Sequence, residues 1–174
     1  EAAEARFDAH IEAWLAAAHA IVPIRVAYRR QDFEAGGTKL DDWHRASLGR
    51  YLEEFKVGDV YEHFPGRTIT EADNIQFSLL TMNQHPMHCD HAFAAKSEFG
   101  KPLVNSALTL AIVVGMTVND VSGKAIANLG WTDIKLTAPV HPNDTVYAES
   151  EVLEVRESKS RPTQGIVRVK TTGR

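Results

Sequence analysis

The first forty residues place apolar side chains at helical spacing. These apolar positions are Phe7, Ile11, Trp14, Leu15, Ala18 and Ile21. A repeat of three or four positions is typical of an amphipathic helix. Pro23 should end or bend this helix, and Gly36-Gly37 indicates a break in regular structure. We therefore predict an N-terminal helical extension over residues 1–40 and a main domain over residues 41–174.

Two further helices are predicted inside the main domain. Thr70 and Asp73 have the spacing of a capping box, which indicates that a helix begins after Thr70 and continues to Leu80. The stretch from Leu103 to Val118 is apolar at nearly every position. It is too long for an ordinary strand and does not alternate, so it predicts a buried helix.

Four stretches predict strands around this second helix. They are residues 60–64, 125–136, 145–155 and 166–171. The last two alternate apolar and polar positions, which is the pattern of strands with one buried face. Consecutive strands after a buried helix favour an α+β domain, in which an antiparallel sheet curls around a central helix. Since no internal repeat is present, we expect one such unit.

Composition narrows the class of protein. The 174 residues are 44% hydrophobic and 24% charged, which is typical of one soluble globular domain. A net charge of −4 argues against nucleic acid as the main partner. The sequence contains no apolar run of the roughly 20 residues that a membrane span needs. Cys89 is the single cysteine, which fits a reducing compartment. We expect a cytoplasmic location, with a mitochondrial or other organellar one left open.

The densest polar cluster covers residues 83–91, and its residue types allow four interpretations. A metal site would need a second group of ligands, which the sequence does not offer, so we expect no metal. Cys89 could be a nucleophile, but adjacent residues rarely point at each other. The histidines could simply satisfy a polar loop. Finally, His88 could be an acid–base catalyst, because an imidazole can both accept and donate a proton near neutral pH.

Four collinear stretches resemble the MaoC-like dehydratase family. They are residues 66–74, 80–90, 99–106 and 138–145, within a match over residues 51–174. The resemblance implies the hotdog fold, in which the sheet wraps the central helix. Members of this family usually continue into one more strand beyond the position of Arg174. We therefore expect that the C-terminal strand is missing, and that a sheet edge is exposed unless another segment replaces it.

The resemblance also implies where the site lies. The hydratase signature of the family reads G-D-x-N-P-x-H, and its Asp and His form a catalytic dyad. In this sequence the two positions are Asn83 and His88, and His85 replaces the signature Asn. An amide cannot transfer a proton as a carboxylate does, so Asn83 is expected to hold a water or a thioester oxygen. His85 and Asp90 are further candidates for the substrate-binding site.

The predicted start of the central helix supplies backbone N–H groups that complement the acid–base residue His88. Asn105 and Ser106 stand where the family usually has His-Gly. Free backbone N–H groups at a helix start can bind a developing enolate oxygen, so we place both residues in the substrate-binding site. Ser106 could instead simply cap the helix.

The implied function is hydration of a 2-enoyl-CoA or the reverse dehydration, with a coenzyme A thioester as substrate and no cofactor. The N-x-H-P-x-H pattern is similar to hydratases of branched, acidic acyl groups such as mesaconyl-CoA. A homodimer or a larger homo-oligomer is also implied. A hotdog thioesterase is one alternative. A non-catalytic acyl-CoA binding protein is another, because the usual aspartate is Asn83.

Overall fold

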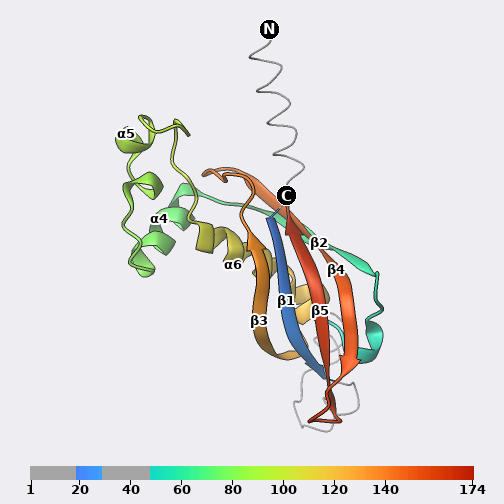
Figure 1. Ribbon diagram of the computed structural model, residues 1–174. Helices are drawn as coiled ribbons and strands as arrows, with labels where there is room; N and C mark the ends of the chain where they lie inside the picture. Colours follow the sequence, from blue (N-terminus) through green and yellow to red (C-terminus); the bar gives the residue numbers. More distant parts are fainter. Residues whose placement is uncertain (1–18, 29–47) are drawn as a thin grey trace.

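The computed structural model describes residues 19–28 and 48–174 of the chain (Figure 1). The strands are β1 (His19–Tyr28), β2 (Val60–Thr68), β3 (Ala125–Lys135), β4 (Thr145–Glu157) and β5 (Gln164–Gly173). The α-helices are α4 (Glu71–Leu80), α5 (His91–Ala94) and α6 (Ser106–Met116). Short 3₁₀ turns lie at η1 (Leu52–Glu54) and η2 (Pro86–His88), and the π-helical turn η3 (Val118–Ser122) follows α6.

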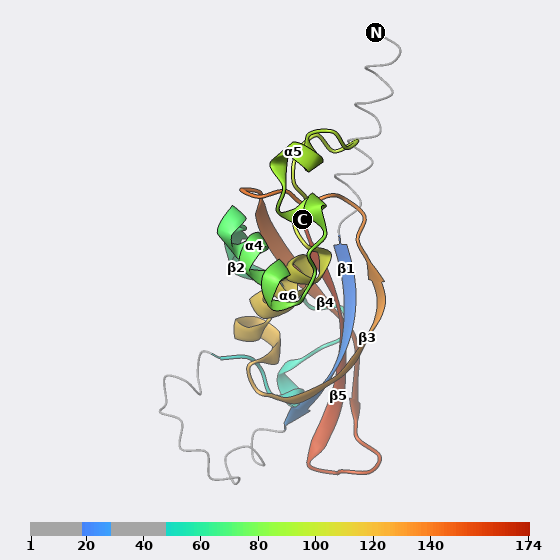
Figure 2. The ribbon, with the colours of Figure 1, turned by 90° about the vertical axis from the view of Figure 1, so that its left-hand side faces the viewer.

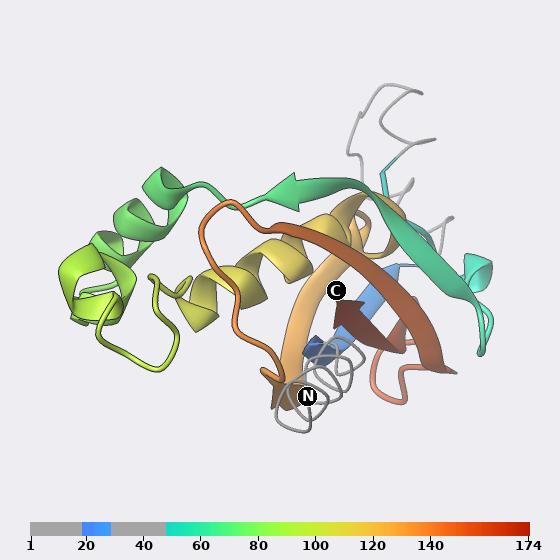
Figure 3. The ribbon, with the colours of Figure 1, turned by 90° about the horizontal axis from the view of Figure 1, so that it is seen from above.

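An antiparallel sheet carries the fold. Its strands lie in the order β2-β4-β5-β1-β3, with β2 and β3 at the edges. The sheet bends around α6, as the view in Figure 3 shows. The buried side chains of this core are Ile69, Val104, Leu108, Val113, Val146 and Ala148. The predicted hotdog arrangement, an antiparallel sheet around a central helix, is confirmed.

The helix predicted after Thr70 is confirmed by the capping contacts of α4. The Thr70 hydroxyl accepts a hydrogen bond from the Asp73 backbone N–H at 3.1 Å. In return, the Asp73 carboxylate accepts one from the Thr70 backbone N–H at 2.8 Å. Both bonds satisfy N–H groups that the first helical turn leaves without a partner. Together they fix where α4 begins.

The central helix α6 is apolar on every side, but the sheet covers only part of it. Leu108, Thr109 and Val113 are buried, whereas Ala107, Ala111 and Gly115 are exposed. The exposed residues follow each other at four-residue spacing, so they form one stripe along the helix. The apolar sequence of α6 therefore serves two surfaces, the core and an open apolar stripe.

The helical prediction was wrong for residues 19–28. These residues form β1, which pairs antiparallel with β5 on one side and with β3 on the other. The helical spacing depends only on neighbouring residues. The strand forms because of hydrogen bonds to β3 and β5, which are far away in the sequence, so the spacing could not predict it. This part of the predicted extension belongs to the sheet of the main domain, and it lies in the sheet beside β5. Residues 1–18 and 29–47, including the predicted boundary near residue 40, lie outside the described residues.

Figures 1 and 2 show α4 and α5 beyond the N-terminal end of α6, outside the sheet. The loop between α4 and α5 contains η2 with His85 and His88 of the sequence cluster, and His91 begins α5. The fold thus brings this loop to the start of α6.

Candidate active site

The turn η2 presents His88 at the start of α6. His85 precedes the turn, and its Nδ1 accepts a hydrogen bond from the Met87 backbone N–H at 3.1 Å. Pro86 stands at the first position of the turn, where a missing N–H costs nothing. Local sequence therefore fixes the loop that carries His88.

The His88 ring is oriented by a backbone carbonyl. Its Nδ1 lies 2.9 Å from the Leu103 oxygen. Because a carbonyl can only accept, Nδ1 must donate. In the neutral ring the proton is then on Nδ1, and Nε2 is the atom that can accept a proton. His88 is half-buried, so this nitrogen can still meet a ligand.

Asn74 on α4 joins His88 to the start of α6, and the sequence analysis gave it no functional role. Its side chain is fully buried. Its Nδ2 donates to the His88 oxygen at 2.9 Å and to the Leu103 oxygen at 3.0 Å. Its Oδ1 accepts from the Asn105 backbone N–H at 2.7 Å. One amide thus fixes three segments that are distant in the sequence.

A weak signal for Asn74 was present in the sequence. Asn74 and Ser78 are four residues apart and are the buried positions of α4. A polar pair at this spacing lies on one helix face, and a helix that buries such a face must satisfy it with hydrogen bonds. Ser78 does so as well, because its hydroxyl accepts from the Asn105 side-chain amide at 3.4 Å.

The start of α6 leaves one backbone donor open. Asn105 caps the helix by accepting from the Ala107 N–H at 3.0 Å, and its carbonyl oxygen accepts from Leu108 and Thr109. Among the described residues, the N–H and the hydroxyl of Ser106 have no protein partner. Ser106 is exposed. The arrangement offers its N–H to a ligand oxygen, while Asn105 acts as the cap.

Asn83, His85 and Asp90 surround His88 without contacting its ring nitrogens. The Asn83 side-chain oxygen accepts from the His85 N–H at 3.3 Å. The Asp90 carboxylate caps α5 by accepting from the Phe93 N–H at 2.9 Å. The exposed His85 ring lies 6.1 Å from the His88 ring, centre to centre. Their predicted roles at a substrate stay predictions.

The N-terminal cap of α4 contains a charged pair, Asp73 and Arg67. Hydrogen bonds from the Thr70 hydroxyl and backbone N–H hold the pKa of the Asp73 carboxyl below its ordinary value, and the nearby Arg67 adds to this effect. Arg67 donates to the Asp73 carboxylate at 2.8 Å. The helix that carries Asn74 therefore keeps a charged cap at neutral pH.

An apolar groove of about 380 Å³ begins at Ala107, the residue after Ser106. It runs along the exposed stripe of α6 to η3, with Trp131 of β3 as its side wall. Its lining residues are Ala107, Leu110, Ala111, Val114, Gly115, Val118, Ser122 and Trp131. Since α6 rises about 1.5 Å per residue, the floor from Ala107 to Val118 extends over roughly 16 Å. Such a groove can hold an extended apolar chain.

No group of three metal-ligating side chains occurs in the described parts of the chain. Among the same residues, no helix is long and apolar enough to cross a membrane.

Asn74→Ala should lower the free energy of unfolding by about 3 kcal/mol, because it leaves buried polar groups of three segments without partners. Gln76→Ala, an exposed change on the same helix, should alter it by no more than about 0.5 kcal/mol. Urea denaturation of both variants measures the difference. Equal effects of the two changes would show that Asn74 does not hold the site together.

Comparisons with known proteins agree on one family. The family model described as "MaoC like domain" matches residues 54–174. A mesaconyl-CoA hydratase from Cereibacter sphaeroides is 30% identical over 129 residues, which cover 74% of this chain and 37% of that protein. A beta-methylmalyl-CoA dehydratase from Chloroflexus aurantiacus is 34% identical and is covered to 36%.

Solved structures support the same assignment. A putative MaoC domain protein dehydratase from Chloroflexus aurantiacus superposes with a TM-score of 0.62 at 27% identity, covering 72% of this chain and 40% of that one. The chain spans less than two fifths of the two curated relatives named above. The match to more than half of the chain, together with this fold, shows that the protein belongs to the MaoC-like domain family.

Proposed function

We propose that the protein adds water to 2-enoyl-CoA thioesters, or removes it from 3-hydroxyacyl-CoA thioesters. The observation that carries the proposal is the hydrogen bond from His88 Nδ1 to the Leu103 oxygen, which leaves Nε2 as a proton acceptor. Asn74 ties this histidine to the helix start with the open Ser106 N–H. The reaction needs two groups, a base and a hydrogen-bond donor that stabilises the oxyanion.

In the proposed hydration, His88 Nε2 takes a proton from water. The hydroxide oxygen forms a bond to C3 of the enoyl group, and the double-bond electrons move onto the thioester oxygen as an enolate. The Ser106 N–H stabilises this negative charge. The His88 imidazolium then returns the proton to C2, and dehydration follows the same steps in reverse. Because one histidine handles both events, hydrogen and hydroxyl should add to the same face.

Asn83 has a supporting role in this mechanism. As an amide it cannot accept the proton, but its oxygen or NH₂ group can hold the water. The exposed His85, close to the His88 ring, is a second titratable group that could contact the substrate. The open groove along α6 would take the acyl group, because it begins next to Ser106 and is mainly apolar.

The acyl class is proposed from the relatives. Their names, mesaconyl-CoA hydratase and beta-methylmalyl-CoA dehydratase, support a branched, dicarboxylic acyl group. The apolar groove supports an apolar acyl chain instead, and the rates with mesaconyl-CoA and crotonyl-CoA decide between the two. The cytoplasmic location stays a prediction.

The described geometry favours a hydratase over a thioesterase. A thioesterase of this fold would need a carboxylate to activate water for attack on the carbonyl. The carboxylate in this loop, Asp90, caps α5 instead. A binding protein without turnover is the remaining alternative, and activity measurements separate it from a hydratase.

His88→Ala should lower the rate of enoyl-CoA hydration by about a thousandfold, because the general base is lost. The loss of conjugated enoyl absorbance with crotonyl-CoA and with mesaconyl-CoA measures this rate. His91→Ala is the matched control, because His91 lies in the same segment and is paired with Glu71 instead. It should keep the activity.

Hydration that persists in the His88 variant would contradict the assignment. Binding of both esters without turnover by the unaltered protein would indicate a binding protein. Release of free thiol from saturated acyl-CoA would indicate a thioesterase.

We also propose a homodimer that buries the edge strand β3. This strand and the residue that follows it carry several exposed apolar side chains, and Trp131 among them lines the open groove. They are Leu129, Trp131 and Ile134 of β3 and Leu136 just after it, with exposed fractions from 43% to 59%. An unpaired edge strand with an apolar face is a pairing surface for another chain. A second copy would also close the groove.

Light scattering should give about twice the chain mass of 19.3 kDa for the unaltered protein. Trp131→Lys should shift it to the monomer mass, because a charge at the interface core is costly. Val57→Lys, an equally drastic change at an exposed turn, should leave the mass unchanged. A monomer in all three samples would exclude this interface.

A further inference from the structure

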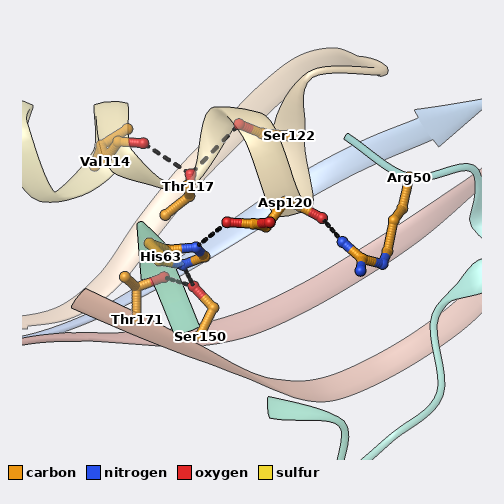
Figure 4. A network of polar contacts seen from close by, with 8 residues as sticks. All are labelled: Arg50, His63, Val114, Thr117, Asp120, Ser122, Ser150 and Thr171. Carbon is orange, nitrogen blue, oxygen red and sulfur yellow. Dashed lines mark hydrogen bonds and ion pairs between the residues drawn. The ribbon is translucent and has the colours of Figure 1, made fainter. Parts of the chain in front are cut away.

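A second histidine, His63 of β2, lies in a buried polar network away from the candidate active site (Figure 4). Its exposed fraction is 4%. Its Nδ1 lies 2.9 Å from the Asp120 carboxylate, and its Nε2 lies 2.8 Å from the Ser150 hydroxyl. Ser150 in turn contacts the Thr171 hydroxyl at 2.8 Å, between β4 and β5.

The order of aspartate, histidine and serine is that of a hydrolytic triad, but this serine cannot act as a nucleophile. Ser150 has an exposed fraction of 0%. Its hydroxyl is also shared between His63 and Thr171. A nucleophile must reach the substrate carbonyl, so the network has a structural role.

The role follows from the position of Asp120 in η3. In this wide turn the Val121 and Ser122 N–H groups both donate to the Thr117 oxygen, at 2.9 and 3.0 Å. A π-helical turn is rare and less stable than an α-helical one, so it needs support from outside. His63 supplies this support from the sheet by donating to the Asp120 carboxylate. Arg50 adds a hydrogen bond to the Asp120 carbonyl oxygen.

The same turn lines the far end of the apolar groove. Val118 and Ser122 of η3 line the groove, at the end opposite to Ala107. Any displacement of η3 would therefore lengthen or shorten the space beside α6. His63 is not among the residues that line the groove, and its hydrogen bond to Asp120 connects it to η3.

We infer that His63 is a positioning residue that fixes the far end of the groove and thereby sets the length of acyl group that the protein accepts. The inference rests on the proposed function in placing the acyl group in this groove. The Asp120 side chain is 33% exposed. Without His63 its carboxylate can turn to water, and η3 loses its side-chain hydrogen bond to β2, while Val121 keeps its packing against the sheet.

Calorimetric binding of butyryl-, octanoyl- and hexadecanoyl-CoA tests the inference without turnover, because these saturated esters cannot be hydrated. The unaltered protein should discriminate between the three lengths. In Asp120→Ala and in His63→Leu, the ratio between the dissociation constants of the weakest-bound and the tightest-bound ester should fall by about tenfold. This equals a loss of about 1.4 kcal/mol in the difference between their binding free energies. Asp120→Ala changes a partly exposed side chain, so it serves if His63→Leu fails to fold.

Two further variants separate positioning from general stability. His63→Gln retains a donor for Asp120 and should restore most of the length preference. Thr171→Val removes the hydrogen bond to Ser150 but leaves the pair of His63 and Asp120, so it should keep the preference. Hydrogen exchange at the Val121 and Ser122 amides should accelerate in Asp120→Ala and not in Thr171→Val.

An unchanged length preference in folded Asp120→Ala would overturn the inference, whatever its catalytic rate. A length preference that is lost in Asp120→Ala would support the inference. If the unaltered protein shows this preference but hydrates no enoyl-CoA, the inference stands and the proposed hydratase activity is contradicted. Absence of binding to all three esters would overturn both.

Discussion

The site depends on the hydrogen bonds of one buried amide. Asn74 links α4 to η2 through the His88 oxygen and to the start of α6 through the Asn105 N–H. Inside a protein such a group must be fully paired, and a paired group allows only one relative position of its partners. The interaction therefore converts three separate segments into one rigid site. The capping pair of Thr70 and Asp73 contributes by fixing where α4 begins.

The central helix α6 connects this site to the rest of the molecule. Its first turn offers the Ser106 N–H, its exposed stripe forms the floor of the groove, and its end continues into η3. Polar contacts support both ends of the helix. At η3 the contact comes from His63 of β2. Just before the helix begins, the Val104 N–H donates to the Val140 oxygen of the loop before β4 at 2.7 Å. Chemistry and acyl length would then be set at opposite ends of one element.

Features with a local cause could be predicted from the sequence. The capping box of α4 and the alternation of β4 needed only neighbouring residues, and the resemblance added the position of His88. Features with long-range causes could not be predicted. Ile21 continues the helical spacing of the residues before it, yet pairing with β3 and β5 makes residues 19–28 a strand. Asn74 acts across 31 positions and His63 across 57 and 87, distances over which periodicity carries no information. The exposed stripe of α6 could not be predicted, because residues that pack in the core and residues that line a groove are apolar alike.

A crystal structure with bound butyryl-CoA would test most directly whether His88 and Ser106 act on one thioester. We expect the thioester oxygen to lie within hydrogen-bond distance of the Ser106 N–H. His88 Nε2 should face C2 and C3, and the acyl chain should enter the groove beside Trp131. A thioester bound instead in the separate pocket of about 330 Å³ between β2 and α6, lined by Phe64, Arg67 and Asn119 among others, would contradict this expectation.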